Sequence, residues 1–118
     1  MKSWADVREM ALAFPGVTEG TSYGTPAFHV GKAFLTRLHE DGESLVLKVG
    51  FDERELLMEA APDVFHITPH YRAWPTVLVR YARAEPGEVR RLFEANWRAR
   101  APRRLVAAHD GNAAAPRA

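Results

Sequence analysis

Two apolar runs joined by the dipeptide Gly31-Lys32 constrain the fold more than any other part of this chain. Residues 27–30 read Ala-Phe-His-Val, and residues 33–38 read Ala-Phe-Leu-Thr-Arg-Leu. A two-residue Gly-X loop is a common connection in a tight β-hairpin, and both runs are rich in strand-forming residues. A turn over residues 40–43 leads to a third run, residues 44–49. The sequence therefore predicts an antiparallel meander.

Helical patterns lie on both sides of this meander. Residues 4–14 repeat apolar side chains at helical spacing, and Pro15-Gly16 ends the pattern. The other predicted elements are a helix over residues 52–60, strands over residues 65–68 and 76–81, and a helix over residues 86–100. Grouped strands and helices predict an α+β fold, with an antiparallel sheet of about five strands and N- and C-terminal helices packed on it.

A chain of 118 residues is long enough for one hydrophobic core. We expect a single domain over residues 1–104 and a disordered tail over residues 105–118, because residues 109–118 lack apolar anchors. The predicted core consists of Val7, Ala11, Phe14, Phe34, Leu45, Leu47, Leu57, Val77, Val79, Leu92 and Phe93.

Composition excludes several classes of protein. The chain has no cysteine, so disulfides, thiol catalysis and thiolate-bound metals are ruled out. The first residues are charged where a signal peptide needs an apolar run, and no segment has the ~18 apolar residues of a membrane span. We expect a cytoplasmic protein with no membrane partner. The net charge of +1 hides an acidic region up to residue 79 and an arginine-rich end. This end fits either a solvated helix face in a chain with a codon bias toward arginine or a surface for an anionic partner.

The segment from Phe65 to Arg80 concentrates side chains that are suited to binding. It holds two His, a Tyr, a Trp, two Arg and two Pro around one turn before an apolar strand. Aromatic side chains there could stack on bases, and arginines could hold phosphates. The predicted nucleic-acid contacts are Tyr71, Arg72, Trp74 and Arg80, with Lys32 and Arg37 added from the hairpin. DNA or another nucleic acid is the partner that this pattern favours.

Two other functions fit the same residues. A small molecule or peptide would bind in a groove between the sheet edge and the turn, which we expect to be lined by Tyr23, Phe28, His29, His66 and Tyr71. Alternatively, the aromatic surface would be covered in a homo-dimer without any ligand. Salt dependence, response to substitutions and concentration-dependent size distinguish the three.

No catalytic, metal or cofactor signature is present. His66 and His70 are four residues apart, but Thr68 and Pro69 between them argue against the helix that would bring both rings to one ion. No glycine-rich phosphate loop or nucleophile elbow occurs. We therefore expect a non-enzymatic protein without cofactor or metal, and either a monomer or a homo-dimer.

Several short motifs in this order resemble the MmcQ/YjbR family of small bacterial proteins. They are Phe-Pro-Gly-Val-Thr-Glu at residues 14–19, Tyr-Gly-Thr-Pro-Ala-Phe at residues 23–28, Val-Gly-Lys at residues 30–32, Leu-Val-Leu-Lys-Val at residues 45–49 and Tyr-Arg-Ala-Trp-Pro-Thr-Val at residues 71–77. The resemblance extends over roughly residues 3–104. It implies a CyaY-like, double-wing fold and a DNA-binding role, and it transfers no iron binding, because a fold does not imply a function.

Overall fold

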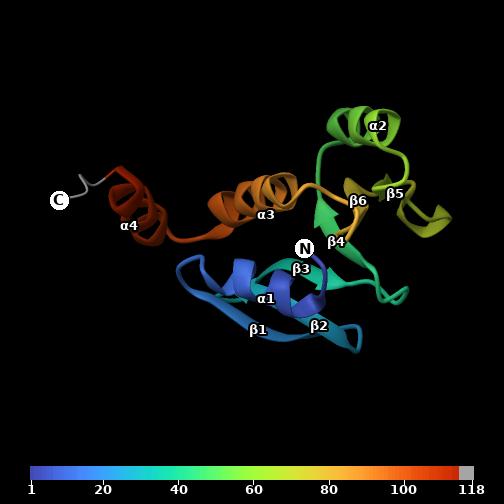
Figure 1. The fold of residues 1–118 in the computed structure, drawn as a ribbon. Helices are drawn as coiled ribbons and strands as arrows, with labels where there is room; N and C mark the ends of the chain where they lie inside the picture. Colours follow the sequence, from blue (N-terminus) through green and yellow to red (C-terminus); the bar gives the residue numbers. More distant parts are fainter. Residues whose placement is uncertain (115–118) are drawn as a thin grey trace.

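An antiparallel sheet forms the frame of the protein, with its strands in the order β1-β2-β3-β4-β6-β5 (Figure 1). The structure is a computed structural model and describes residues 1–114. The strands are β1 (Val17–Ser22), β2 (Thr25–Val30), β3 (Ala33–Leu38), β4 (Ser44–Lys48), β5 (Phe65–His66) and β6 (Thr76–Arg80). The helices are α1 (Trp4–Leu12), α2 (Phe51–Ala60), the 3₁₀ turn η1 (Pro69–Tyr71), α3 (Pro86–Arg100) and α4 (Arg103–Ala114).

The predicted α+β class and antiparallel sheet are confirmed, and the sheet has one strand more than expected. The additional strand is β1, which pairs along its whole length with β2. Only Val17 in β1 is buried, and the remaining residues are mostly exposed. A polar edge strand lacks the apolar alternation by which strands are identified, so the sequence pattern could not indicate it.

Both hairpins at this end of the sheet have two-residue loops. In the predicted Gly31-Lys32 loop, Gly31 has a φ of 58°, a conformation that glycine adopts without steric cost. In the loop between β1 and β2, Tyr23 has a φ of 53° and Gly24 a φ of 77°. Tyr23 is the one non-glycine residue with positive φ within residues 1–114, which marks this hairpin tip as locally strained.

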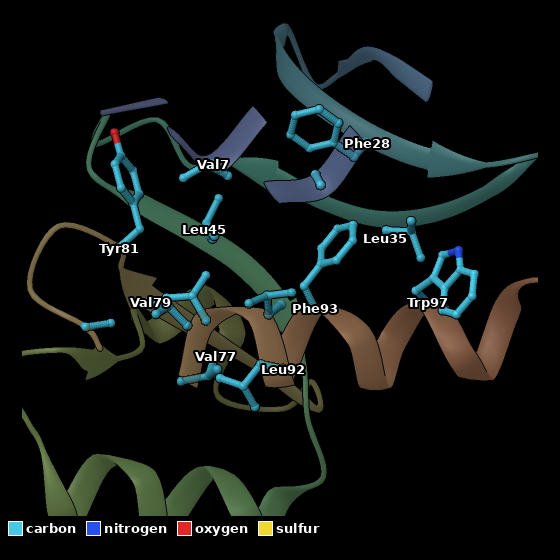
Figure 2. Close-up of a cluster of buried hydrophobic side chains, with 14 of the residues drawn as sticks. Val7, Phe28, Leu35, Leu45, Val77, Val79, Tyr81, Leu92, Phe93 and Trp97 are labelled. Carbon is cyan, nitrogen blue, oxygen red and sulfur yellow. The ribbon is translucent and has the colours of Figure 1, made fainter. Parts of the chain in front are cut away.

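The hydrophobic core lies on one face of the sheet, under α1 and α3. Figure 2 shows Phe93 projecting from α3 toward the strands, with Trp97 further along the helix and Leu35 coming from β3. Phe14 packs against both Phe93 and Trp97, with ring centroids 5.3 Å apart in each pair. Ten of the predicted core residues belong to this region: Val7, Ala11, Phe14, Leu45, Leu47, Val77, Val79, Leu92 and Phe93 are buried in it, and Leu57 packs half-buried at its margin.

Phe34 is the exception, because it lies on the opposite face. The pairing of β2 with β3 shifts register between Phe28 and His29, so that His29 pairs with Phe34 but Phe28 pairs with Thr36. Leu35 is the additional residue of this β-bulge, and it occupies the core position. The prediction that Phe34 belongs to the core is therefore wrong, because its pairing with His29 places it on the face opposite the core, whereas the bulge adds Leu35 to the core face.

The C-terminal segment differs from the predicted disordered tail. Residues 103–114 form α4, which continues beyond the C-terminal end of α3 (Figure 1). The ring of His109 lies 5.2 Å from that of Phe14 and 5.0 Å from that of Trp97, and Arg98 pairs with Asp110. Leu105 and Val106 of α4 also pack half-buried against the core, so apolar contacts hold this segment together with the ring contacts and the ion pair. Residues 115–118 of the expected tail lie outside the described residues.

Among residues 1–114, no helix combines the length and the apolar character needed to cross a membrane.

Candidate functional site

The face of the sheet opposite the core contains a hollow of about 820 Å³. Strand positions on β2, β3, β4 and β6 form its floor, and the Tyr23 hairpin tip and the turn before β6 form its rim. None of its lining residues within the described chain comes from α1, α2, α3 or α4. The lining residues are Ser22, Tyr23, His29, Lys32, Phe34, Arg37, His39, Glu40, Val46, Lys48, Thr68, His70, Tyr71, Trp74 and Thr76.

Four aromatic side chains from distant parts of the sequence meet around this hollow. Tyr23 and Trp74 are 86% and 60% exposed, although large aromatic side chains usually bury most of their surface. Phe34 and Tyr71 are half-buried below them. Exposed aromatic faces beside a hollow are available for stacking on a planar ligand.

The charges of the hollow are mainly positive. Its lining contains three cations, Lys32, Arg37 and Lys48, and one carboxylate, Glu40, which gives a net charge of +2 with the histidines neutral. Neither lysine forms an ion pair within residues 1–114. The two lysines therefore remain available to an anionic ligand.

Arg37 is a buried part of the wall. Its Nη1 donates to Glu40 Oε1 at 2.8 Å, its Nη2 donates to the Tyr71 hydroxyl at 3.0 Å, and its guanidinium lies 5.1 Å from the Tyr23 ring centroid. Burial opposes its charge, but the hydrogen bonds and attraction from Glu40 and Tyr71 prevail and raise its pKa. The hydrogen bond from Arg37 in turn lowers the pKa of Glu40. Arg37 thus positions two aromatic side chains of the rim.

A second buried arginine holds the turn that carries Tyr71 and Trp74. Arg54 of α2 is 4% exposed. It donates to four backbone carbonyl oxygens, those of Tyr71 at 3.0 Å, Arg72 at 3.1 Å, Trp74 at 2.7 Å and Thr76 at 3.1 Å. A planar guanidinium with five donors suits this task, whereas an ammonium group lacks the required spread. The turn is therefore rigid while the Trp74 side chain stays exposed.

His66 lies beside the hollow without lining it. Its Nε2 is 3.0 Å from Ser44 Oγ. Burial, and then the positive charge of Arg80, lower the pKa of His66. Ser44 is fully buried, so this pair is not accessible to a substrate. The described residues contain no group of three or more His, Cys, Asp or Glu side chains that could hold a metal ion.

The structure brings together only part of each predicted residue set. Among the predicted nucleic-acid contacts, Tyr71, Trp74, Lys32 and Arg37 line the hollow, whereas Arg72 and Arg80 do not. Arg80 donates to Glu43 and to the backbone oxygen of Asp63, and Arg72 is exposed in the turn.

Among the predicted groove residues, Tyr23, His29 and Tyr71 line the hollow. Phe28 is fully buried on the core face, where its ring stacks on that of Trp4 at 5.4 Å. The β-strand alternation accounts for this placement, because Phe28 precedes His29 and so points to the other side of the sheet.

Sequence reasoning missed Phe34, Lys48, Glu40 and Arg54. A signal existed for Lys48, since it is a charged residue at an alternate position of an otherwise apolar strand. A signal existed for Phe34 as well, since the two-residue Gly31-Lys32 loop pairs it with His29 and paired residues share a face of the sheet. Arg54 reads as an ordinary surface residue of an amphipathic helix, and its role depends on contacts with residues 71–76.

Comparison with known proteins agrees with this architecture. The family model named YjbR matches residues 12–99, which include every described strand and every lining residue of the hollow. The chain belongs to the YjbR family. This bears out the family resemblance seen in the sequence motifs.

The relatives of this YjbR chain include uncharacterised proteins of Mycobacterium bovis (Mb2600) and Mycobacterium tuberculosis (Rv2570). Each is 38% identical over 56 residues, which are 48% of this chain and 43% of the relative. The match thus spans less than half the length of these curated relatives. The crystal structure of Deinococcus radiodurans protein DR2400, with a DUF419 domain, superposes with a TM-score of 0.69 at 21% identity, over 82% of this chain and 77% of that one. This similarity shows the fold.

Proposed function

We propose that this protein is a non-enzymatic nucleic-acid-binding protein and that the hollow on the open sheet face takes unpaired bases of a single strand. The observation that carries the proposal is the convergence of exposed aromatic side chains and lysines without ion-pair partners in one hollow. Every base has a π-face, so an aromatic surface binds single strands with little regard to sequence.

Base stacking and phosphate contacts have separate residues in this proposal. Tyr23 and Trp74 offer the most exposed rings, and each stacked base contributes roughly 1–3 kcal/mol. Lys32 and Lys48 attract the phosphates, and this contribution weakens with salt. Arg37 and Arg54 act indirectly by holding the aromatic rim and turn, since both guanidinium groups are buried and hydrogen-bonded within the protein.

The single strand is favoured over the duplex by the position of the aromatic groups. Bases in a duplex are stacked on one another and cannot lie against Tyr23 or Trp74. A duplex binder also presents an evident basic face, whereas residues 1–79 of this chain are acidic overall.

The test is fluorescence anisotropy with labelled single- and double-stranded DNA and RNA at about 50 and 200 mM salt. We expect single strands to bind more tightly than duplexes, with an affinity that falls steeply as salt rises. Trp74→Ala should weaken binding by roughly 1–3 kcal/mol. Leu56→Ala is the matched control, because Leu56 is also a large exposed apolar side chain but lies on α2, outside the hollow.

Absence of single-strand binding at 50 mM salt, or equal losses in Trp74→Ala and Leu56→Ala, would overturn the proposal. If a strand binds tightly but its affinity does not change with salt, the second candidate function is favoured, which is binding of a small planar molecule. The volume of the hollow supports that candidate, because about 820 Å³ lies within the range of small-molecule sites. A size that grows with protein concentration, without any ligand response, would point to the homo-dimer.

A further inference from the structure

A second hollow, of about 430 Å³, lies where β4 ends and the chain turns into α2. It is bounded on its other side by the C-terminal half of α3. Its lining residues are Lys48, Val49, Gly50, Pro75, Ala95, Asn96, Ala99 and Arg100. Lys48 lines both hollows, and Pro75 lies between Trp74 and Thr76 of the first. The two hollows are therefore adjacent on the surface.

Asn96 organises the second hollow. It is 5% exposed, and its Nδ2 donates to the backbone oxygens of Lys48 and Leu92, at 3.0 Å each. Its Oδ1 accepts from Arg100 Nη1 at 3.0 Å. The buried side-chain amide of Asn96 thus holds both the backbone of Lys48 and the guanidinium of Arg100 by hydrogen bonds. Both amide donors and the oxygen are occupied, so the arrangement is fixed.

Arg100 differs in its partners from Arg91 and Arg98 of the same helix, whereas Arg90 also forms no ion pair within residues 1–114 and lies over the Phe14 ring. Arg91 pairs with Glu53 and Glu88, and Arg98 pairs with Glu94 and Asp110. Arg100 has only the neutral groups of Asn96 as partners, and within residues 1–114 it forms no ion pair.

A guanidinium that is held in place but not neutralised retains its full attraction for an anion. Arg100 shares its hollow with Lys48, whose ammonium also lacks an ion-pair partner among the described residues. Two like charges facing one hollow repel each other, and a bound phosphate would remove that repulsion.

We propose that a single strand bound in the first hollow continues past Lys48 into the second, where its phosphates contact Lys48 and Arg100. This inference rests on the proposed function and extends it, because it assigns a path and a minimum length to the ligand. A strand that reaches both hollows binds more tightly than one confined to the first. Arg100 contributes only to the longer strand.

The experiment compares oligothymidylates of three and twelve nucleotides, with wild-type protein and Arg100→Gln. Anisotropy of the labelled strand gives the affinity of the twelve-nucleotide strand, and quenching of tryptophan fluorescence by a stacked base gives that of the short one. Arg100→Gln should weaken binding of the long strand about three- to tenfold at 50 mM salt and reduce its salt slope by about 0.7, the value of one phosphate contact on a single strand. Binding of the short strand should not change.

Two further variants keep the result specific. Arg83→Gln removes the same charge from an exposed arginine near the start of α3, at the other end of this helix from Arg100, and should leave both affinities unchanged. Arg100→Lys restores the charge and should recover much of the lost affinity. Melting temperatures of all variants establish that they are folded.

The outcomes separate the two proposals. If the wild-type protein binds both strands but Arg100→Gln behaves like Arg83→Gln, the path through the second hollow is overturned while the proposed function stands. If the wild-type protein binds neither strand at 50 mM salt, both proposals fail together.

Discussion

The same strands form both faces of the sheet, but the two faces carry different kinds of side chain. On the core face, Phe28, Leu45 and Val77 are fully buried under α1 and α3. On the other face, neighbouring positions of the same strands carry His29, Lys48 and other polar side chains around a hollow. Alternation along each strand divides the residues between the two.

The two faces of the sheet also differ in which parts of the protein cover them. The core face is closed by side chains from helices, so its contents are fixed by volume and apolarity. The open face is bordered by a hairpin tip and a turn, and buried arginines behind the rim hold its aromatic groups. Stability should therefore depend mainly on the first face and ligand binding mainly on the second. The predictions that follow test this division.

The largest effect on stability is expected from Phe93→Ala. Phe93 is fully buried on the core face and contacts the ring of Phe14, and removing such a side chain costs about 3–5 kcal/mol. The matched variant is Phe34→Ala on the open face, where the ring is half-buried and lines the hollow. It should cost less than half as much. Urea unfolding measures both, and equal losses would mean that the open face is a second core.

Arg54→Met should give the next largest effect. It removes the guanidinium from four carbonyl oxygens. Those of Tyr71 and Trp74 keep a backbone N–H donor, and each buried group that is left unsatisfied costs roughly 1–3 kcal/mol. Because these carbonyls belong to the turn that carries Trp74, ligand affinity should fall together with stability. Arg54→Lys keeps the charge but should rescue little, since one ammonium cannot reach all four oxygens.

Hydrogen exchange of the amides in residues 71–76 provides the decisive readout for Arg54→Met. Faster exchange confined to this turn would support a positioning role. Uniformly faster exchange throughout the sheet would contradict it, because that result would indicate a general loss of stability.

Most of the core face could be predicted from the sequence. Apolar periodicity identified α1, β4, β6 and α3, and the Gly31-Lys32 loop fixed a hairpin. Such patterns work because burial depends on the local period of side chains along each element. Periodicity failed for β1, whose pattern is polar, and for Phe34, whose face is set by its pairing with His29 of the neighbouring strand.

The open face was predicted only in part. Tyr71 and Trp74 were found from their composition, since aromatic residues between prolines are unusual in a turn. Arg80 was grouped with them because it is near in sequence, but its guanidinium binds Glu43 and Asp63 instead. Lys48 and Arg54 lie far from this turn in sequence and reach it only through strand pairing and a helix contact. Local patterns carry no information about such contacts.

A smaller, pH-dependent effect is expected from His66, which lies on the edge strand β5, on the face of the sheet that carries the hollow. Its pKa is lowered by burial and by Arg80, so the unfolded chain takes up the proton first as pH falls. The stabilising contribution is complete above the ordinary pKa of about 6.5 and is lost as pH falls below it toward the folded value. One group changes the free energy of unfolding by at most about 1.4 kcal/mol per pH unit.

His66→Gln should therefore flatten the loss of stability below pH 6.5, measured by urea unfolding in steps from pH 7.5 to 5. His70→Gln is the control, because His70 is exposed in the turn. The pKa values of Glu40 and Asp41 are lowered, so these carboxylates lose their stabilising contributions at more acidic pH. A change in the free energy of unfolding between pH 7.5 and 5 is therefore assigned to histidine. A wild-type curve that is flat between pH 7.5 and 5 would contradict the prediction.

The smallest effect on stability, together with a clear effect on binding, is expected from Tyr23→Asn. Tyr23 has left-handed backbone geometry at a hairpin tip followed by Gly24, where Asn-Gly is the favoured pair. Relief of about 1 kcal/mol of strain should offset the lost contact with Arg37, which contributes about 0.5–1 kcal/mol at an exposed site. Stability should therefore stay within about 0.5 kcal/mol of wild type, whereas single-strand affinity should fall by roughly 1–3 kcal/mol.

Urea unfolding and anisotropy on the same preparation of Tyr23→Asn decide this prediction. A variant that is more stable by over about 1 kcal/mol and binds as well as wild type would contradict it, because the strained tyrosine would then have no role in binding. If stability is unchanged and binding is weaker, then the exposed and strained side chain of Tyr23 serves ligand binding on the open face. Strain of this kind persists where a side chain must point at a ligand rather than into the core, and the core face has no counterpart among residues 1–114.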